Sequence, residues 1–201
     1  MSEFRTCYIL VFPLLALMHI NLSGQELVIN EFLASNSAVN ADPDFNDYSD
    51  WIELYNDLDT EIDLSNWFLA DNLIDSTKWQ IPEGVTIEPK GFLTIWADEY
   101  DTSLYHLHTN FRLSKAGEVI VLFNSDTILI DSIVYSEQIL DISFGRYPDG
   151  GSNWEFFDNP TLGRSNDTPP YLKVSKPHFS LSPGFYIEDQ ILEISNADSL
   201  A

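Results

Sequence analysis

The sequence predicts an all-β fold in which two antiparallel sheets pack face to face as a sandwich. Between Gln25 and Asn166, apolar and polar side chains alternate in about nine short segments, the pattern of half-buried strands. Gly, Pro, Asn and Asp residues separate these segments and supply turns. No apolar repeat of helical period is sustained beyond one turn, so the pattern favours packed sheets over alternating strands and helices.

The expected strands are short and rich in β-branched and aromatic residues, which fit a pleated surface. Alternation in the first strand places Ile29 and Glu31 on one face and Asn30 and Phe32 on the other. In chain order the expected strands are 26–34, 51–55, 62–69, 76–81, 92–97, 118–123, 127–135, 141–147 and 153–157.

Residues 50–72 are the stretch around which the chain is organised. The strand at 51–55 places Ile52 and Leu54 on one face, and Asn and Asp residues at 56–59 supply a turn. Apolar groups at 62–69 then return to the same core, so we expect two strands joined by an acidic turn. A second short connection, at 124–126, predicts a hairpin between 118–123 and 127–135.

Several sequence motifs in this chain resemble those of the lamin tail domain, which is found in nuclear lamins and in many secreted bacterial proteins. They include INEFLASN at 29–36, WIELYN at 51–56, DLSNWFLADN at 63–72 and HTNFRLSKAGE at 108–118. The resemblance covers residues 25–166 and implies an immunoglobulin-like antiparallel β-sandwich. It also implies that bacterial members accompany secreted or surface hydrolases and CotH-type proteins.

Residues 1–24 have the organisation of a signal peptide. Arg5 precedes an apolar run at 7–20, and Gly24 offers a small residue for cleavage before Gln25. A retained N-terminal anchor is the alternative. We expect a secreted, extracellular or cell-surface protein with no membrane span after cleavage. Since Cys7 is the one cysteine in the sequence, the exported chain would contain no disulfide.

The C-terminal part of the sequence predicts a linker followed by a second unit. Asp167-Thr-Pro-Pro170 has the composition of a linker over 167–170. Residues 171–201 resemble the first strands of the small β domain at the carboxyl end of chitobiase and β-hexosaminidase-type proteins. We therefore expect 171–201 to be the incomplete N-terminal part of a second small β domain.

Acidic residues dominate the charge of this chain. The formal net charge is −23, from 32 acidic and 9 basic residues. Affinity for nucleic acid comes largely from Lys and Arg, so we expect no nucleic-acid partner, although lamin tails contribute to DNA contacts in lamins. A solvated acidic surface and a cation-binding surface both remain open.

The loop at 42–53 is the candidate calcium site. Asp42, Asp44, Asn46 and Asp50 follow an EF-hand-like spacing, and calcium prefers several oxygen ligands of this kind. Glu53 continues the spacing, but its strand would hold it away from the loop. Position 6 of the loop is an aspartate rather than glycine, so a solvated acidic loop is the alternative.

His106 and His108 would share one face of an extended segment, as in some metal sites. Without cysteine or a clear third ligand, we interpret them as exposed loop histidines. The sequence also lacks the Gly-x-Ser-x-Gly turn of a hydrolase nucleophile, so we expect no catalytic residues and no cofactor other than the candidate calcium ion.

The pattern and the resemblance together indicate a noncatalytic lamin-tail module of an exported bacterial protein, acting in adhesion, targeting or spacing. One alternative is the N-terminal fragment of a larger secreted or surface enzyme or CotH-type protein whose catalytic domain lies beyond residue 201. Another is a calcium- or carbohydrate-binding module. The sequence does not identify the protein or carbohydrate partner.

Overall fold

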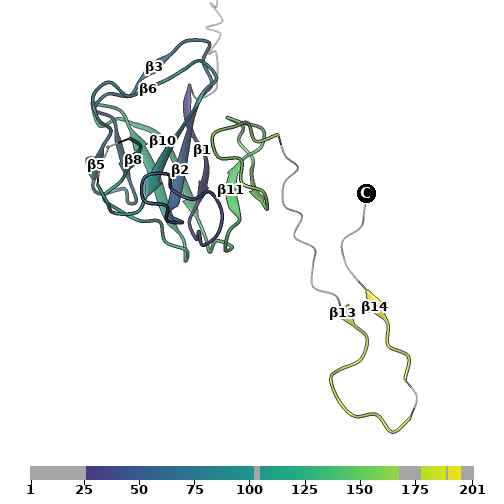
Figure 1. Ribbon diagram of the computed structural model, residues 1–201. Coiled ribbons are helices and arrows are strands. Elements are labelled where there is room, and N and C mark those ends of the chain that lie inside the picture. The colour runs from purple at the N-terminus through teal and green to yellow at the C-terminus, as the bar shows by residue number, and fades with distance from the viewer. Residues whose placement is uncertain (1–25, 102–104, 168–177, 189, 196–201) are drawn as a thin grey trace, which may run out of the picture.

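A computed structural model describes residues 26–101, 105–167, 178–188 and 190–195 (Figure 1). Every regular element in these residues is a strand. Ten of the strands form the two stacked, mainly antiparallel sheets of an immunoglobulin-like sandwich, so the predicted fold class is confirmed. The expected signal peptide, 1–24, lies outside the described residues, as do most of the linker and residues 171–177.

The larger sheet has six strands in the order β12-β11-β1-β2-β7-β8. Only the pairing of β7 with β8 is parallel. Its members are β1 (Leu27–Leu33), β2 (Asp50–Asn56), β7 (Phe92–Ala97), β8 (Leu107–His108), β11 (Ser143–Arg146) and β12 (Trp154–Phe157).

The smaller sheet has four strands in the order β10-β9-β4-β5, and two short pairs complete the fold. The hairpin predicted around 124–126 is present, because β9 and β10 pair antiparallel. The elements are β4 (Phe68–Ala70), β5 (Trp79–Gln80), β9 (Glu118–Phe123) and β10 (Leu129–Tyr135), with pairs β3 (Ile62–Asp63)–β6 (Thr86–Ile87) and β13 (His178–Phe179)–β14 (Ile194–Ser195).

The acidic turn after β2 crosses between sheets rather than closing a hairpin. β2 pairs with β1 and β7, whereas the expected strand 62–69 is divided into β3 and β4. A turn separates them: Asn66 has a φ of 64°, and the Trp67 amide donates to the Leu64 carbonyl at 3.0 Å. The expectation of one strand there was wrong, because alternating apolar residues do not reveal a turn between them.

A β-bulge in β1 changes which side chains face the core. The register with β2 shifts between Ile29 and Glu31, so Ile29 and Phe32 both pack in the core between the sheets. Strict alternation had placed these two side chains on opposite faces. An extra residue in a bulge reverses the phase of the side chains that follow it.

Two side chains stabilise this bulge: Asp131, from β10 in the smaller sheet, and Arg146, from β11 beside β1. Asp131 Oδ2 accepts a hydrogen bond from the Ile29 amide at 2.8 Å, and Arg146 Nε donates to the Ile29 carbonyl at 2.8 Å. Arg146 Nη2 lies 3.0 Å from Asp131 Oδ2, and both side chains are buried. The ion pair therefore satisfies backbone groups that the irregular ladder leaves free.

The outer face of the larger sheet is also buried, which explains why β1 and β2 have almost no exposed residue. Trp51, Leu33 and Trp96 form a cluster there, with Leu162 packed against it. Leu162 belongs to the segment 158–166, which we call the covering segment because it lies over this face of the sheet.

Two glutamates lie beneath the covering segment, on this outer face. Glu31 and Glu53 are paired across β1 and β2, and both are fully buried. The Thr161 amide donates to Glu31 Oε1 at 3.0 Å, and the Gly163 amide donates to Glu53 Oε2 at 2.6 Å. The covering segment is therefore anchored by hydrogen bonds to two buried carboxyl groups.

Candidate functional site

Strand β8 carries the first residue of the candidate site. It pairs Leu107 with Ile95 and His108 with Trp96, so His108 lies on the outer face of the sheet beside Trp96. The expected exposure is confirmed for His106, whose side chain is 47% exposed, and wrong for His108, which is 0% exposed. A strand of two residues has too few positions to show alternation, so the sequence indicated a loop here.

Three aspartates surround the His108 ring. Asp98 Oδ2 lies 2.8 Å from His108 Nδ1, and Asp42 Oδ2 lies 3.8 Å from the same nitrogen. On the other side of the ring, Asp44 Oδ2 lies 3.2 Å from His108 Nε2. We call Asp42, Asp44, Asp98 and His108 the histidine–aspartate cluster.

The loop between β1 and β2 folds into a turn that positions two members of the cluster. The Asp42 amide donates to the Asp47 carbonyl at 2.7 Å, and the Asn46 amide donates to the Asp42 carbonyl at 2.8 Å. Asp42 Oδ1 then accepts the Asp44 amide at 2.8 Å. This turn directs the carboxylates of Asp42 and Asp44 toward the His108 ring, as the distances above require.

Asp44 is held by both histidines. His106 Nδ1 lies 2.8 Å from Asp44 Oδ1, and the His106 amide donates to Asp44 Oδ2 at 3.1 Å. Desolvation would raise the pKa of Asp44, but the hydrogen bonds from His106 and His108 prevail and lower it below its ordinary value. Asp44 is therefore a stable anion beside the His108 ring.

Asp42 differs from its neighbours because one of its oxygens has no hydrogen bond. Asp42 is 0% exposed, and its Oδ2 atom is buried without a hydrogen-bond partner. Asp42, Asp98 and His108 are all buried, and each offers one ligand atom within 4.8 Å of the others. The arrangement of one imidazole and two carboxylates has the donor types of a divalent metal site.

Aromatic rings cover one side of the cluster. The Phe45 ring centroid lies 5.1 Å from that of His108 and 4.1 Å from that of Tyr100. Phe45 and Tyr100 are themselves partly exposed. The rings restrict the access of water to the imidazole from this side.

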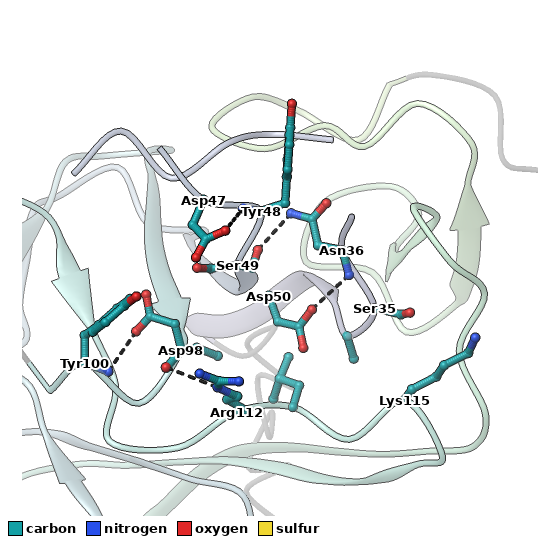
Figure 2. Close-up of a pocket in the computed structure, with 13 residues that line it drawn as sticks. Ser35, Asn36, Asp47, Tyr48, Ser49, Asp50, Asp98, Tyr100, Arg112 and Lys115 are labelled. Carbon is teal, nitrogen blue, oxygen red and sulfur yellow. Dashed lines mark hydrogen bonds between the residues drawn. The ribbon is translucent and has the colours of Figure 1, made fainter. Parts of the chain in front are cut away.

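A polar pocket with a cavity volume of about 400 Å³ adjoins the cluster, with Asp98 in its wall. Figure 2 shows Asp50 near the middle of the pocket, with Asp98 and Tyr100 at one end and Lys115 at the other. Asn36 and Tyr48 also line it. We call this cavity the end pocket.

Asp50 has the most perturbed carboxyl group in the end pocket. Burial raises its pKa to about 7, against the opposing effects of the hydrogen bond from the Asn36 amide and the positive charge of Arg112. The Asn36 amide donates to Asp50 Oδ1 at 3.0 Å (Figure 2). The charge of the pocket therefore changes near neutral pH.

Three of the four predicted calcium ligands lie in the histidine–aspartate cluster or the end pocket. Asp42 and Asp44 lie in the histidine–aspartate cluster, and Asp50 lies in the end pocket. Asn46 is exposed and contributes its backbone amide to the turn. Sequence reasoning missed Asp98; its only signal was its position directly after the strand at 92–97.

The structure is therefore an immunoglobulin-like β-sandwich in which the end pocket lies beside the histidine–aspartate cluster. A family model described as Lamin Tail Domain matches residues 22–137, more than half of the chain. The chain belongs to the lamin tail domain family, whose members are noncatalytic immunoglobulin-like domains. A search of curated proteins found no match. Across the part of the chain that the structure covers, no helix has the length and apolar character to cross a membrane.

Proposed function

We propose that this chain is a noncatalytic lamin tail module of an exported bacterial protein, which binds a partner in adhesion or targeting. The observation that carries the proposal is the end pocket, a concave polar site on a rigid sandwich. A module used only for spacing would need no such pocket. The organisation of residues 1–24 supports export.

The contacts of the histidines support a noncatalytic role. In the described loops and strands, Nδ1 of His106 and both ring nitrogens of His108 contact aspartates rather than a serine or threonine hydroxyl. A general base for a nucleophile needs a hydrogen bond to that hydroxyl. The histidines are therefore arranged to bind charge, not to activate a nucleophile.

The composition of the end pocket favours a carbohydrate as the partner. Tyr48 and Tyr100 offer apolar ring surfaces, and they are 46% and 49% exposed. Asn36, Asp50 and Arg112 also line the pocket and offer hydrogen-bond donors and acceptors. A saccharide presents hydroxyl groups beside apolar C–H faces, and this lining is complementary to both.

A glycan array probed with the labelled full chain tests the proposal. We expect binding to a restricted set of saccharides, with a loss of at least about 10-fold in Tyr48→Ala or Tyr100→Ala, because each removes a contact ring. Tyr105→Ala is the matched control, since Tyr105 is 89% exposed and does not line the pocket.

Equal binding by wild type and both pocket variants would exclude the end pocket as the binding site. Absence of binding to any glycan, together with absence of binding to the surface of bacterial cells, would refute the adhesion proposal. Binding to cells that pocket variants lose, without any glycan signal, would replace the carbohydrate with a protein partner.

A further inference from the structure

We propose that Asp42, Asp98 and His108 bind a divalent transition-metal ion of the zinc class. The proposal concerns the histidine–aspartate cluster and does not depend on the partner of the end pocket. It rests on three features: the positions of the ligand atoms, the excess of buried negative charge, and the contact that orients the imidazole.

The three candidate ligand atoms are Asp42 Oδ2, Asp98 Oδ2 and His108 Nδ1. His108 Nδ1 lies 2.8 Å from Asp98 Oδ2 and 3.8 Å from Asp42 Oδ2. Around a tetrahedral zinc ion with bonds of about 2.0–2.2 Å, neighbouring ligand atoms are about 3.3–3.6 Å apart. The observed separations lie on both sides of this range, so small side-chain shifts would enclose an ion.

The charge of the cluster favours a cation. Three buried or nearly buried carboxylates, those of Asp42, Asp44 and Asp98, surround one imidazole. Asp42 Oδ2 is the buried oxygen without a hydrogen-bond donor, and an unpaired buried charge is strongly unfavourable. A divalent ion between Asp42 and Asp98 would satisfy this oxygen and neutralise the excess charge.

Asp44 is the positioning residue for the imidazole. Its Oδ2 atom lies 3.2 Å from His108 Nε2, on the side of the ring opposite to Asp42 and Asp98. If Nε2–H donates to Asp44, then the lone pair of Nδ1 faces the two other carboxylates. Carboxylates commonly hold metal-binding histidines in this way, and they fix the tautomer.

The ligand types favour a first-row transition ion over calcium. Calcium takes six to eight oxygen ligands, whereas this cluster places a nitrogen at its centre. Imidazole and carboxylate together suit zinc and its neighbours in the series. Asp98 also lines the end pocket, so one of the three ligand residues borders the solvent-filled cavity.

Titration calorimetry on the chelator-treated full chain tests the proposal, with zinc, calcium and magnesium chlorides as probes. We expect one zinc ion per chain and weaker binding of the other two. Zinc in about 100-fold excess over Kd is expected to raise Tm by about 5–10 °C. Cobalt(II) is expected to give the intense visible absorption of a tetrahedral site.

Four variants assign the binding to the cluster. We expect Asp44→Asn to weaken zinc binding about 10–100-fold, and Asp42→Asn and His108→Gln to weaken it further, because they remove ligands. His178→Ala is the matched control and is expected to bind zinc as wild type does, since His178 lies in the separate β13–β14 pair. Circular dichroism of each variant shows whether it is folded. If His108→Gln does not fold, Asp42→Asn still tests the loss of a ligand.

Three results would overturn the assignment. The first is an absence of zinc binding by the wild-type chain, which would leave the cluster as a set of contacts between His108 and the three aspartates. The second is equal zinc affinity in wild type and Asp42→Asn. The third is tighter binding of calcium than of zinc, which would restore the oxygen-ligand interpretation of the 42–53 loop.

Discussion

Raising the pH above 4.5 is expected to destabilise the protein, because two buried glutamates face each other across β1 and β2. Burial, and then the nearby charge of Glu31, raise the pKa of Glu53 from 4.5 to about 9. Burial also raises the pKa of Glu31, against hydrogen bonds from Ser143 and Thr161 that lower it. Like charges directly opposite in neighbouring strands are unfavourable, so the folded protein retains protons here.

The size of the effect follows from the proton balance of Glu53. Between pH 4.5 and about 9 the folded protein binds more protons than the unfolded chain, so the free energy of unfolding falls as pH rises. One pKa unit corresponds to about 1.4 kcal/mol, and the interval from pH 4.5 to 7 therefore removes about 3 kcal/mol. Asp50, with its pKa raised to about 7, adds in the same direction.

Carboxyl groups with a lowered pKa change the free energy of unfolding only at a more acidic pH. Asp44, Asp63 and Asp141 have pKa values below 3.8, so they are ionised in both states above pH 4.5 and add no slope there. Their stabilising contribution is lost as the pH falls from the ordinary pKa of 3.8 to these lowered values. The interval from pH 4.5 to 8 therefore reports on the carboxyl groups whose pKa is raised, which are the two buried glutamates, Asp50 and Glu118.

Urea unfolding followed by tryptophan fluorescence, in steps from pH 4.5 to 8 at constant ionic strength, measures the effect. The matched variant is Glu31→Gln. Asn166 Nδ2 donates to the Arg146 carbonyl, so its Oδ1 accepts the Thr161 hydroxyl proton. The same hydroxyl shares its proton with Glu31 Oε2, and the Thr161 amide donates to Glu31 Oε1, so the side-chain oxygen of a glutamine keeps one of these two acceptor positions.

We expect Glu31→Gln to be more stable than wild type at pH 8 and to lose less stability from pH 4.5 to 8. Its removal of one negative charge lowers the pKa of Glu53 toward its ordinary value. A free energy of unfolding that is constant or rises between pH 5 and 8 would refute the reasoning. An identical pH slope in the variant would show that the two glutamates do not interact.

Three further predictions concern stability, each measured by urea unfolding at pH 6. Arg146→Met is expected to cost about 3–5 kcal/mol, because it leaves Asp131 buried without its cation, whereas Arg164→Met changes little. Phe32→Ala is expected to cost about 3–5 kcal/mol through the cavity in the core; a loss below about 1 kcal/mol would contradict its placement there. Gly117→Ala is expected to cost at least about 1–3 kcal/mol, since its φ is +107° and a Cβ would lie 2.6 Å from the Tyr135 carbonyl oxygen. Gly184→Ala, with open space around it, is the control and should be neutral.

Local sequence patterns predicted the longer strands because these strands bury apolar residues in register with their own alternation. The strands at 92–97 and 118–123 agree with the elements β7 and β9. The bulge in β1 was not predictable in this way. It depends on Asp131 and Arg146, which lie more than one hundred residues after Ile29.

The candidate site was only partly visible in the sequence for the same reason. Asp42 and Asp44 stood out because they are close together in an acidic loop. His108 and Asp98 join them through the parallel pairing of β7 and β8, which no local pattern indicates. Spacing along the chain instead grouped Asn46 and Asp50 with them, although Asp50 lies in the end pocket.

The covering segment has a practical consequence for where this module can be cut. The family match ends at residue 137, but β11 sits inside the larger sheet, between β12 and β1. A fragment truncated at 137 would turn β1 into a bare sheet edge and would uncover Trp51 and the paired glutamates. Such a fragment is expected to aggregate. An expressed fragment that preserves the native unit therefore has to extend at least through Asn166, whose backbone amide donates a hydrogen bond to Asp149 Oδ1.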